Sequence, residues 1–133
     1  FVSGIALANA GLGAAHGFAA GLGGMYDIPH GLICAVFLPH VLEANADHIR
    51  GELAHLVAGR NGAMDPVEWL CEAVRRLLAR YGLPIDLSAY RIPVEQAPEI
   101  VARSAGSSMR GNPWDIPADE QERIVRRVIG GGA

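Results

Sequence analysis

The feature that most constrains this chain is a long stretch with almost no charge at its amino-terminal end. Residues 1–42 contain a single charged side chain, Asp27, whereas charged residues recur at nearly every helical turn from Glu43 onward. Apolar surface on this scale is unfavourable in water, so we expect the first third of the chain to be buried in a core or an interface. The remainder has the pattern of ordinary amphipathic structure.

The length and composition indicate one globular domain. The chain has 133 residues, of which 50% are hydrophobic and 19% charged, which excludes intrinsic disorder. Aromatic residues make up only 6%, too few for a typical all-β core, and no run alternates polar and apolar residues for long enough to form a strand. We therefore expect an all-α helical bundle with six or seven helices.

Start and stop signals divide the chain into these helices. Asp65 followed by Pro66 is typical of a helix N-terminus, and Gly82 is expected to end the helix that begins there. Pro39 is expected to introduce a kink or boundary, and the segment from Gly106 to Pro113 is expected to be a loop. Helices are predicted over residues 1–11, 13–25, 29–45, 47–58, 66–81, 93–104 and 117–129.

Charge and cysteine content exclude several kinds of partner. Eleven basic residues, all arginine, are outnumbered by 14 acidic ones, giving a net charge of −3 and a pI of about 5.9, so no nucleic-acid partner is expected. Cys34 and Cys71 do not form a disulfide framework. Both cysteines are interpreted as small buried side chains in a reducing compartment, which favours the cytoplasm.

A membrane-spanning helix is an alternative interpretation of residues 1–24, which carry no charge and are long enough to span a bilayer. Gly13, Gly17 and Gly21 form a small-residue row that is typical of closely packed membrane helices. Against a span, Asn9 and His16 fall inside it, and no positive cluster flanks it. We favour close helix packing in a water-soluble core and expect no membrane partner.

Two histidines stand in the uncharged region and are the candidate metal ligands. His16 and His30 are 14 residues apart, so on one continuous helix they would be about 21 Å apart and could share no ligand. A chain reversal at Gly23–Gly24 and Pro29 allows both imidazoles to reach one metal between two antiparallel helices. The alternative interpretation is two hydrogen-bonded core histidines. Two ligands are too few for a stable site, so further ligands are expected from outside this chain.

The motifs around these histidines resemble the iron-containing alcohol dehydrogenases. The resemblance rests on Asn9–Gly17 (NAGLGAAHG), Leu22–Gly31 (LGGMYDIPHG), Leu38–Val41 (LPHV) and the later segment Ser107–Pro113 (SSMRGNP). It extends over about residues 1–130. The chain also starts without an initiator Met, and we expect it to be the C-terminal piece of a longer protein.

The resemblance implies a fold, a cofactor set and an activity. Family members have an N-terminal α/β domain that binds NAD or NADP and a C-terminal helical domain of the dehydroquinate synthase-like type. One divalent metal, iron or in some members zinc, is held in the cleft by an Asp and three His. The last two His match His16 and His30, while the other ligands and the nucleotide-binding glycines would lie upstream. The implied reaction is metal-assisted hydride transfer between an alcohol and an aldehyde or ketone.

Two positions depart from the family pattern. Many alcohol-oxidising members carry a further His four residues after the one matching His16, where this chain has Ala20, and this leaves the substrate open. Ile33 replaces a residue that is usually small. Asp27 is expected to cap the helix that follows it or to orient a ligating His.

The remaining histidines are interpreted as structural. We expect His40 to form a hydrogen bond across the bundle, and His48 and His55 to lie on the surface beside Asp47 and Glu52. Trp69 and Trp114 are expected to anchor their segments by packing.

An alternative function is a non-catalytic helical interaction domain that docks a partner through its apolar N-terminal surface. If residues 1–42 are normally covered by a second domain, the isolated chain should self-associate, and a homo-oligomer is expected. The leading interpretation remains the metal-binding helical domain of an NAD(P)-dependent oxidoreductase that acts on a small alcohol or carbonyl substrate.

Overall fold

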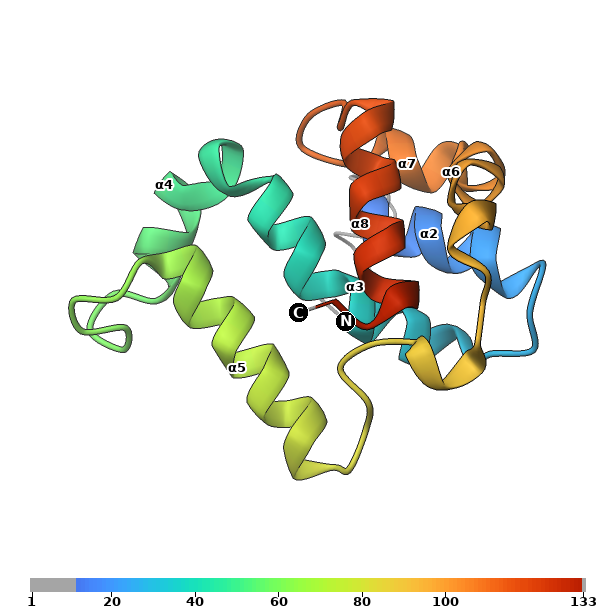
Figure 1. Ribbon diagram of the computed structural model, residues 1–133. Coiled ribbons are helices and arrows are strands. Elements are labelled where there is room, and N and C mark those ends of the chain that lie inside the picture. Colours follow the sequence, from blue (N-terminus) through green and yellow to red (C-terminus); the bar gives the residue numbers. More distant parts are fainter. Residues whose placement is uncertain (1–11, 133) are drawn as a thin grey trace.

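The computed structural model describes residues 12–132, and every regular element in that range is a helix (Figure 1). The prediction of an all-α fold is therefore confirmed for the described part of the chain. The helix expected over residues 1–11 lies outside it. The α-helices are α2 (Ala14–Gly23), α3 (His30–Ala44), α4 (Ala46–Leu56), α5 (Pro66–Arg80), α6 (Ala97–Ser104), α7 (Ser107–Arg110) and α8 (Ala118–Gly130), with 3-10 turns η1 (Ser88–Tyr90) and η2 (Val94–Gln96).

The start of α5 follows from its capping residues. The Asp65 side chain accepts hydrogen bonds from the backbone N–H groups of Val67 (2.9 Å) and Glu68 (3.3 Å), while Pro66 occupies the first turn. These contacts satisfy amide groups that have no partner within the helix. At the other end Gly82 adopts a left-handed conformation, with φ of 65°, that disfavours a side chain. Both predicted boundaries are confirmed.

Three local expectations are wrong. Pro93 precedes a 3-10 turn, and α6 begins only at Ala97. The expected loop after Gly106 contains the short helix α7. The capping role assigned to Asp27 is not observed, because the cap position of α3 is Pro29 and the exposed Asp27 makes no side-chain cap there.

Two groups of helices meet along α3. In Figure 1, α2, α6, α7 and α8 gather on one side of α3, while α4 and α5 lie on the other. Pro39 is buried within α3, which continues through it, and the Cys71 thiol of α5 donates a hydrogen bond to the Pro39 carbonyl oxygen (3.4 Å). The fully buried side chains of the core include Phe18, Leu22, Ile33, Val36, Phe37, Leu87, Ile100, Val125 and Val128.

The uncharged stretch is buried within the chain itself. From Ala14 to Val41 its large apolar side chains contribute to the core, and Leu38, at 37% exposure, is the exception among the described residues. The larger exposures occur later, at Leu56 and Tyr81 (70% each). The described N-terminal residues therefore expose little apolar surface for a partner, while self-association of the chain stays a prediction. None of the described helices has the length and apolar character needed to cross a bilayer.

The glycine row permits a close approach between helices, as predicted. A Cβ atom at Gly21 would lie 2.5 Å from Ser104 Oγ and 3.0 Å from the Ile100 carbonyl oxygen, and one at Gly17 would lie 2.9 Å from Met109 Cε. Gly17 and Gly21 therefore face α6 and α7. The small-residue row still serves helix packing, because it lets the backbones approach each other.

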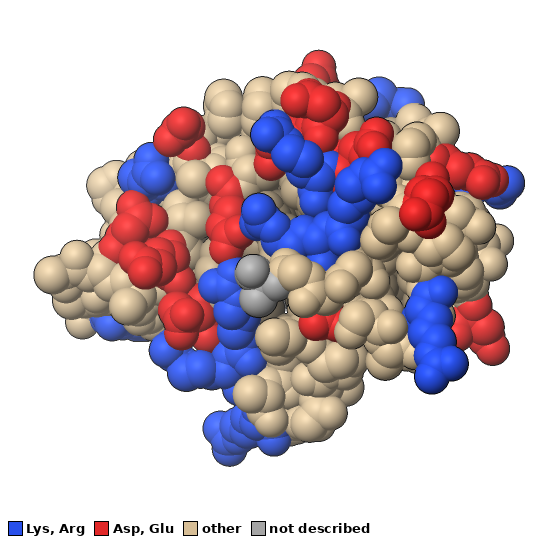
Figure 2. All heavy atoms as spheres, in the orientation of Figure 1, with Lys and Arg blue, Asp and Glu red and all other residues tan. Residues whose placement is uncertain are grey.

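Charged side chains of both signs are interspersed on the face drawn in Figure 2. Among the described residues, several oppositely charged pairs are spaced one helical turn apart, such as Glu122 with Arg126 (2.6 Å) and Glu99 with Arg103 (2.9 Å). Such exposed pairs add little stability and mainly keep the surface hydrated.

Candidate metal centre

His16 and His30 lie side by side although 14 residues separate them in sequence. The centroids of their imidazole rings are 5.3 Å apart, with an angle of 58° between the ring planes. His16 is the third residue of α2, and His30 is the first residue of α3. The two side chains therefore meet at the beginnings of two helices.

The chain reverses between α2 and α3, as predicted. A Cβ atom at Gly23, the last residue of α2, would lie 3.7 Å from Ile33 Cδ1 near the start of α3. Phe18, earlier in α2, contacts Phe37, later in α3. These two contacts therefore progress in opposite directions along the two helices.

A stacked aromatic pair holds the contact between α2 and α3. The rings of Phe18 and Phe37 are fully buried, with centroids 4.9 Å apart and an interplanar angle of 24°. Phe18 lies two residues after His16 in α2, and Phe37 lies seven residues after His30 in α3. This packing fixes the positions from which the two imidazoles project.

Cys34 is a third potential ligand that the sequence interpretation assigned only to the core. Its Sγ lies 3.5 Å from His30 Nε2, and the ligand atoms of His16, His30 and Cys34 all lie within 4.8 Å of one another. Its spacing from His30 was the available signal, because residues four apart on a helix share one face. The cysteine was overlooked because its apolar neighbours favoured burial.

The three side chains differ in their access to solvent. His16 and Cys34 are half-buried and His30 is exposed, so the cluster opens to the surface on the His30 side. Burial raises the pKa of the Cys34 thiol, and a backbone hydrogen bond partly offsets this effect. Imidazole nitrogen and thiolate sulfur are the donors that bind zinc and other borderline divalent metals. The residues present therefore fit a metal ion.

Asp27 does not join this cluster. It is exposed, and among the described residues no hydrogen bond or ion pair links its carboxylate to either imidazole. Its second expected role, orienting a ligating His, is therefore not observed there.

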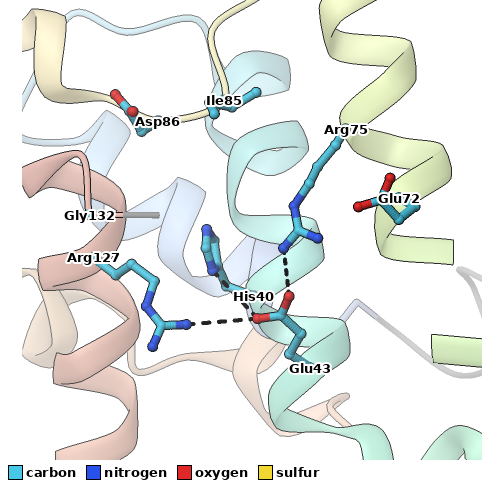
Figure 3. Close-up of a pocket in the computed structure, with 8 residues that line it drawn as sticks. All are labelled: His40, Glu43, Glu72, Arg75, Ile85, Asp86, Arg127 and Gly132. Atoms are coloured by element: carbon cyan, nitrogen blue, oxygen red, sulfur yellow. Dashed lines mark hydrogen bonds and ion pairs between the residues drawn. The ribbon is translucent and has the colours of Figure 1, made fainter. Parts of the chain in front are cut away.

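His40 belongs to a separate charged cleft of about 430 Å³ between α3, α5 and α8 (Figure 3). Glu43 lies at its centre and pairs with Arg75 (2.6 Å) and Arg127 (3.8 Å). His40 Nδ1 lies 3.9 Å from Glu43 and is buried without a hydrogen-bond partner among the described residues, so the expected bond across the bundle is not observed at this nitrogen. Burial lowers the pKa of His40, with Glu43 opposing the shift and Arg127 and Arg75 adding to it.

The other histidines lie on the surface, as predicted. His48 and His55 are both exposed on α4. The imidazole of His48 stacks on Trp114, with ring centroids 5.0 Å apart. The Trp114 indole N–H donates to the Ala44 carbonyl oxygen (3.2 Å), which confirms its anchoring role.

Comparison with known proteins agrees with this fold. Residues 1–129 match the model of the Fe-containing alcohol dehydrogenase family, C-terminal. The chain is 39% identical to a 1,3-propanediol dehydrogenase of Citrobacter freundii over 96% of its length and 34% of that protein's. It is 38% identical to alcohol dehydrogenase 4 of Saccharomyces cerevisiae (strain YJM789), again covering 96% of the chain and 34% of the relative.

A solved structure shows the same fold. A crystal structure of 1,3-propanediol oxidoreductase superimposes with a TM-score of 0.85 at 29% identity, covering 96% of this chain and 35% of that one. The chain thus spans about a third of the length of the relatives it matches. On these matches, the chain belongs to the iron-containing alcohol dehydrogenase family, to whose C-terminal region it corresponds.

Proposed function

We propose that this chain is the metal-binding helical domain of a longer NAD(P)-dependent oxidoreductase that interconverts an alcohol with an aldehyde or ketone. The observation that carries the proposal is the pair of imidazoles, His16 and His30, 5.3 Å apart at the starts of α2 and α3. Further ligands and the nucleotide site would come from the rest of the longer protein. We place that protein in the cytoplasm, where Cys34 and Cys71 stay reduced.

The role of this chain is to hold and shape one wall of the site. A divalent metal bound there, iron or zinc, would supply Lewis-acid polarisation of the substrate oxygen. His16 and His30 bind as neutral imidazoles, and their positions depend on the Phe18–Phe37 stack beneath them. The buried apolar side chains behind the imidazoles exclude water from this side, which strengthens electrostatic interactions at the site.

The substrate class follows from the relatives and from one side chain. Relatives bear the names 1,3-propanediol dehydrogenase and alcohol dehydrogenase, so we propose a small alcohol or its carbonyl product. Ala20 lies one turn after His16 and is exposed. A methyl group there cannot transfer a proton, so any proton relay in the longer protein must use another group.

The test compares metal content and turnover in the full-length protein. His16→Ala and His30→Ala should each remove most of the bound metal, measured by inductively coupled plasma mass spectrometry. Each should also remove most of the NAD(P)⁺-dependent oxidation of 1,3-propanediol. His55→Ala is the matched control, because it removes an exposed imidazole from α4, away from the candidate ligands. It should change neither quantity.

Full metal occupancy in the His16→Ala, His30→Ala double variant would overturn the assignment. Circular dichroism on each variant separates a loss of metal from a loss of fold. Lost turnover with unchanged metal content would show that the imidazoles act on substrate and not as ligands, and would also contradict the proposal.

A further inference from the structure

The cluster on α2 and α3 contains one more donor atom than the histidine pair. Cys34 lies one helical turn after His30, so the two side chains project from the same face of α3, and His16 approaches them from α2. Two ligands four residues apart on one helix form a common metal-binding arrangement, because their side chains converge on one point. Three donors from two packed helices therefore point to a site that this chain forms by itself.

The distances suit a shared metal ion. Tetrahedral coordination with a nitrogen bond of about 2.05 Å and a sulfur bond of about 2.3 Å separates the two donor atoms by about 3.6 Å. Cys34 Sγ and His30 Nε2 are 3.5 Å apart. The largest separation in the cluster, within 4.8 Å, requires only a modest side-chain rotation of one donor.

The nature of the donors determines which metals fit. A thiolate is a soft ligand and two imidazoles are borderline ligands, a combination that favours zinc and cobalt over manganese. Among the described residues the cluster includes no carboxylate, so the thiolate supplies its negative charge. The half-buried position of Cys34 limits competition from water while the exposed side at His30 leaves an entry path.

We propose that Cys34 is a metal ligand, and that His16, His30 and the Cys34 thiolate form a three-donor site that binds Zn²⁺ within this chain. The proposal deepens the proposed function, because it rests on the same two histidines as ligands. On binding, the Cys34 S–H bond breaks, a sulfur–metal bond forms and the proton passes to solvent. No electron is transferred.

The second cysteine provides the matched control. Cys71 is 1% exposed in α5, donates its hydrogen bond to the Pro39 carbonyl oxygen and lies outside the cluster. Its burial raises the pKa of the thiol to about 11, so it remains protonated. Cys34→Ser and Cys71→Ser thus make the same chemical change at two positions, of which one is proposed to bind metal.

The experiment titrates the reduced 133-residue chain with Co²⁺ and Zn²⁺. Co²⁺ should produce a near-ultraviolet sulfur-to-cobalt charge-transfer band that Cys71→Ser retains and Cys34→Ser abolishes. X-ray absorption of the zinc form should show one sulfur at about 2.3 Å and nitrogen neighbours at about 2.0–2.1 Å. Cys34→Ser should weaken Zn²⁺ binding at least as much as the roughly 10–100-fold typical of changes around a metal site.

The outcomes separate this inference from the proposed function. A zinc shell without sulfur, unchanged Zn²⁺ affinity in Cys34→Ser, or no metal binding by the chain would each overturn the role of Cys34 and leave the enzyme assignment standing. A sulfur band and Zn²⁺ affinity that persist in His16→Ala would instead contradict the histidine pair and hence the proposed function. If a variant fails to fold, the X-ray absorption spectrum of the wild-type zinc form still tests whether sulfur binds the metal.

Discussion

The side-chain amides of Asn45 and Asn112 exchange two hydrogen bonds across 67 residues of sequence. Asn45 Nδ2 donates to Asn112 Oδ1 (3.0 Å), and Asn112 Nδ2 donates to Asn45 Oδ1 (2.7 Å). Asn112 also donates to the Trp114 carbonyl oxygen and accepts from the Ala14 N–H at the start of α2. The pair thus connects the end of α3 to the first turn of α2, two residues before His16.

Replacing Asn112 by alanine should destabilise the chain by about 2–4 kcal/mol, because it leaves the buried amide of Asn45 without its partner. Urea unfolding followed by circular dichroism measures the change. Asn61→Ala is the control, since its amide donates a single exposed bond to Met64, and it should cost at most about 1 kcal/mol. Equal losses in both variants would contradict this account of the pair.

Gly21→Ala should lower the free energy of unfolding by about 1–3 kcal/mol, because the new methyl group meets the backbone of α6. Gly51→Ala is the matched change in α4, where a Cβ has nothing within 4 Å, and it should stabilise the chain by about 0.5–1 kcal/mol through helix propensity. Thermal melts of the two variants should therefore shift in opposite directions. A stabilised Gly21→Ala would refute the close contact.

Phe37→Ala should cost about 3–5 kcal/mol, because it removes half of the buried aromatic stack and leaves a cavity between α2 and α3. It should also weaken Zn²⁺ binding, since the stack positions the helices that carry His16 and His30. Leu56→Ala, at a side chain 70% exposed, should change stability by less than about 0.5 kcal/mol and leave Zn²⁺ binding unchanged. Urea unfolding measures the change in stability of each variant, and calorimetric titration with Zn²⁺ measures the change in metal affinity.

Acidification should destabilise the chain through His40. Its pKa in the folded state lies below the ordinary value of 6.5 because the ring is buried, so the unfolded chain binds the proton more readily. The stabilising contribution is complete above pH 6.5 and is lost as the pH falls toward the folded pKa. His40→Gln should flatten the dependence of the unfolding free energy on pH in this window.

Glu43→Gln should have the opposite effect on that dependence. The Glu43 carboxylate raises the pKa of His40, whereas Arg127 and Arg75 lower it, so removing the carboxylate leaves only the lowering effects. The loss of stability as the pH falls below 6.5 should therefore steepen. Identical slopes in the wild type, His40→Gln and Glu43→Gln would show that another group governs the acid sensitivity.

Much of the fold was determined by local sequence signals. Asp65, Pro66 and Gly82 determine the ends of α5 through capping bonds and backbone conformation, and these interactions require only neighbouring residues. The helix predicted over residues 117–129 is likewise present as α8 (Ala118–Gly130). The pairing of His16 with His30 was predicted on two grounds, the chain reversal expected between them and the family resemblance.

Tertiary structure decided the features that depend on how helices cross. Cys34 became a donor at the cluster because α2 approaches the His30 face of α3, and Gly17 and Gly21 met α6 and α7 although α3 is nearer in sequence. Local periodicity identifies the face of a helix that is apolar, but not the helix that covers it. That choice depends on side-chain packing between segments up to about 90 residues apart in the chain, such as Gly17 against Met109.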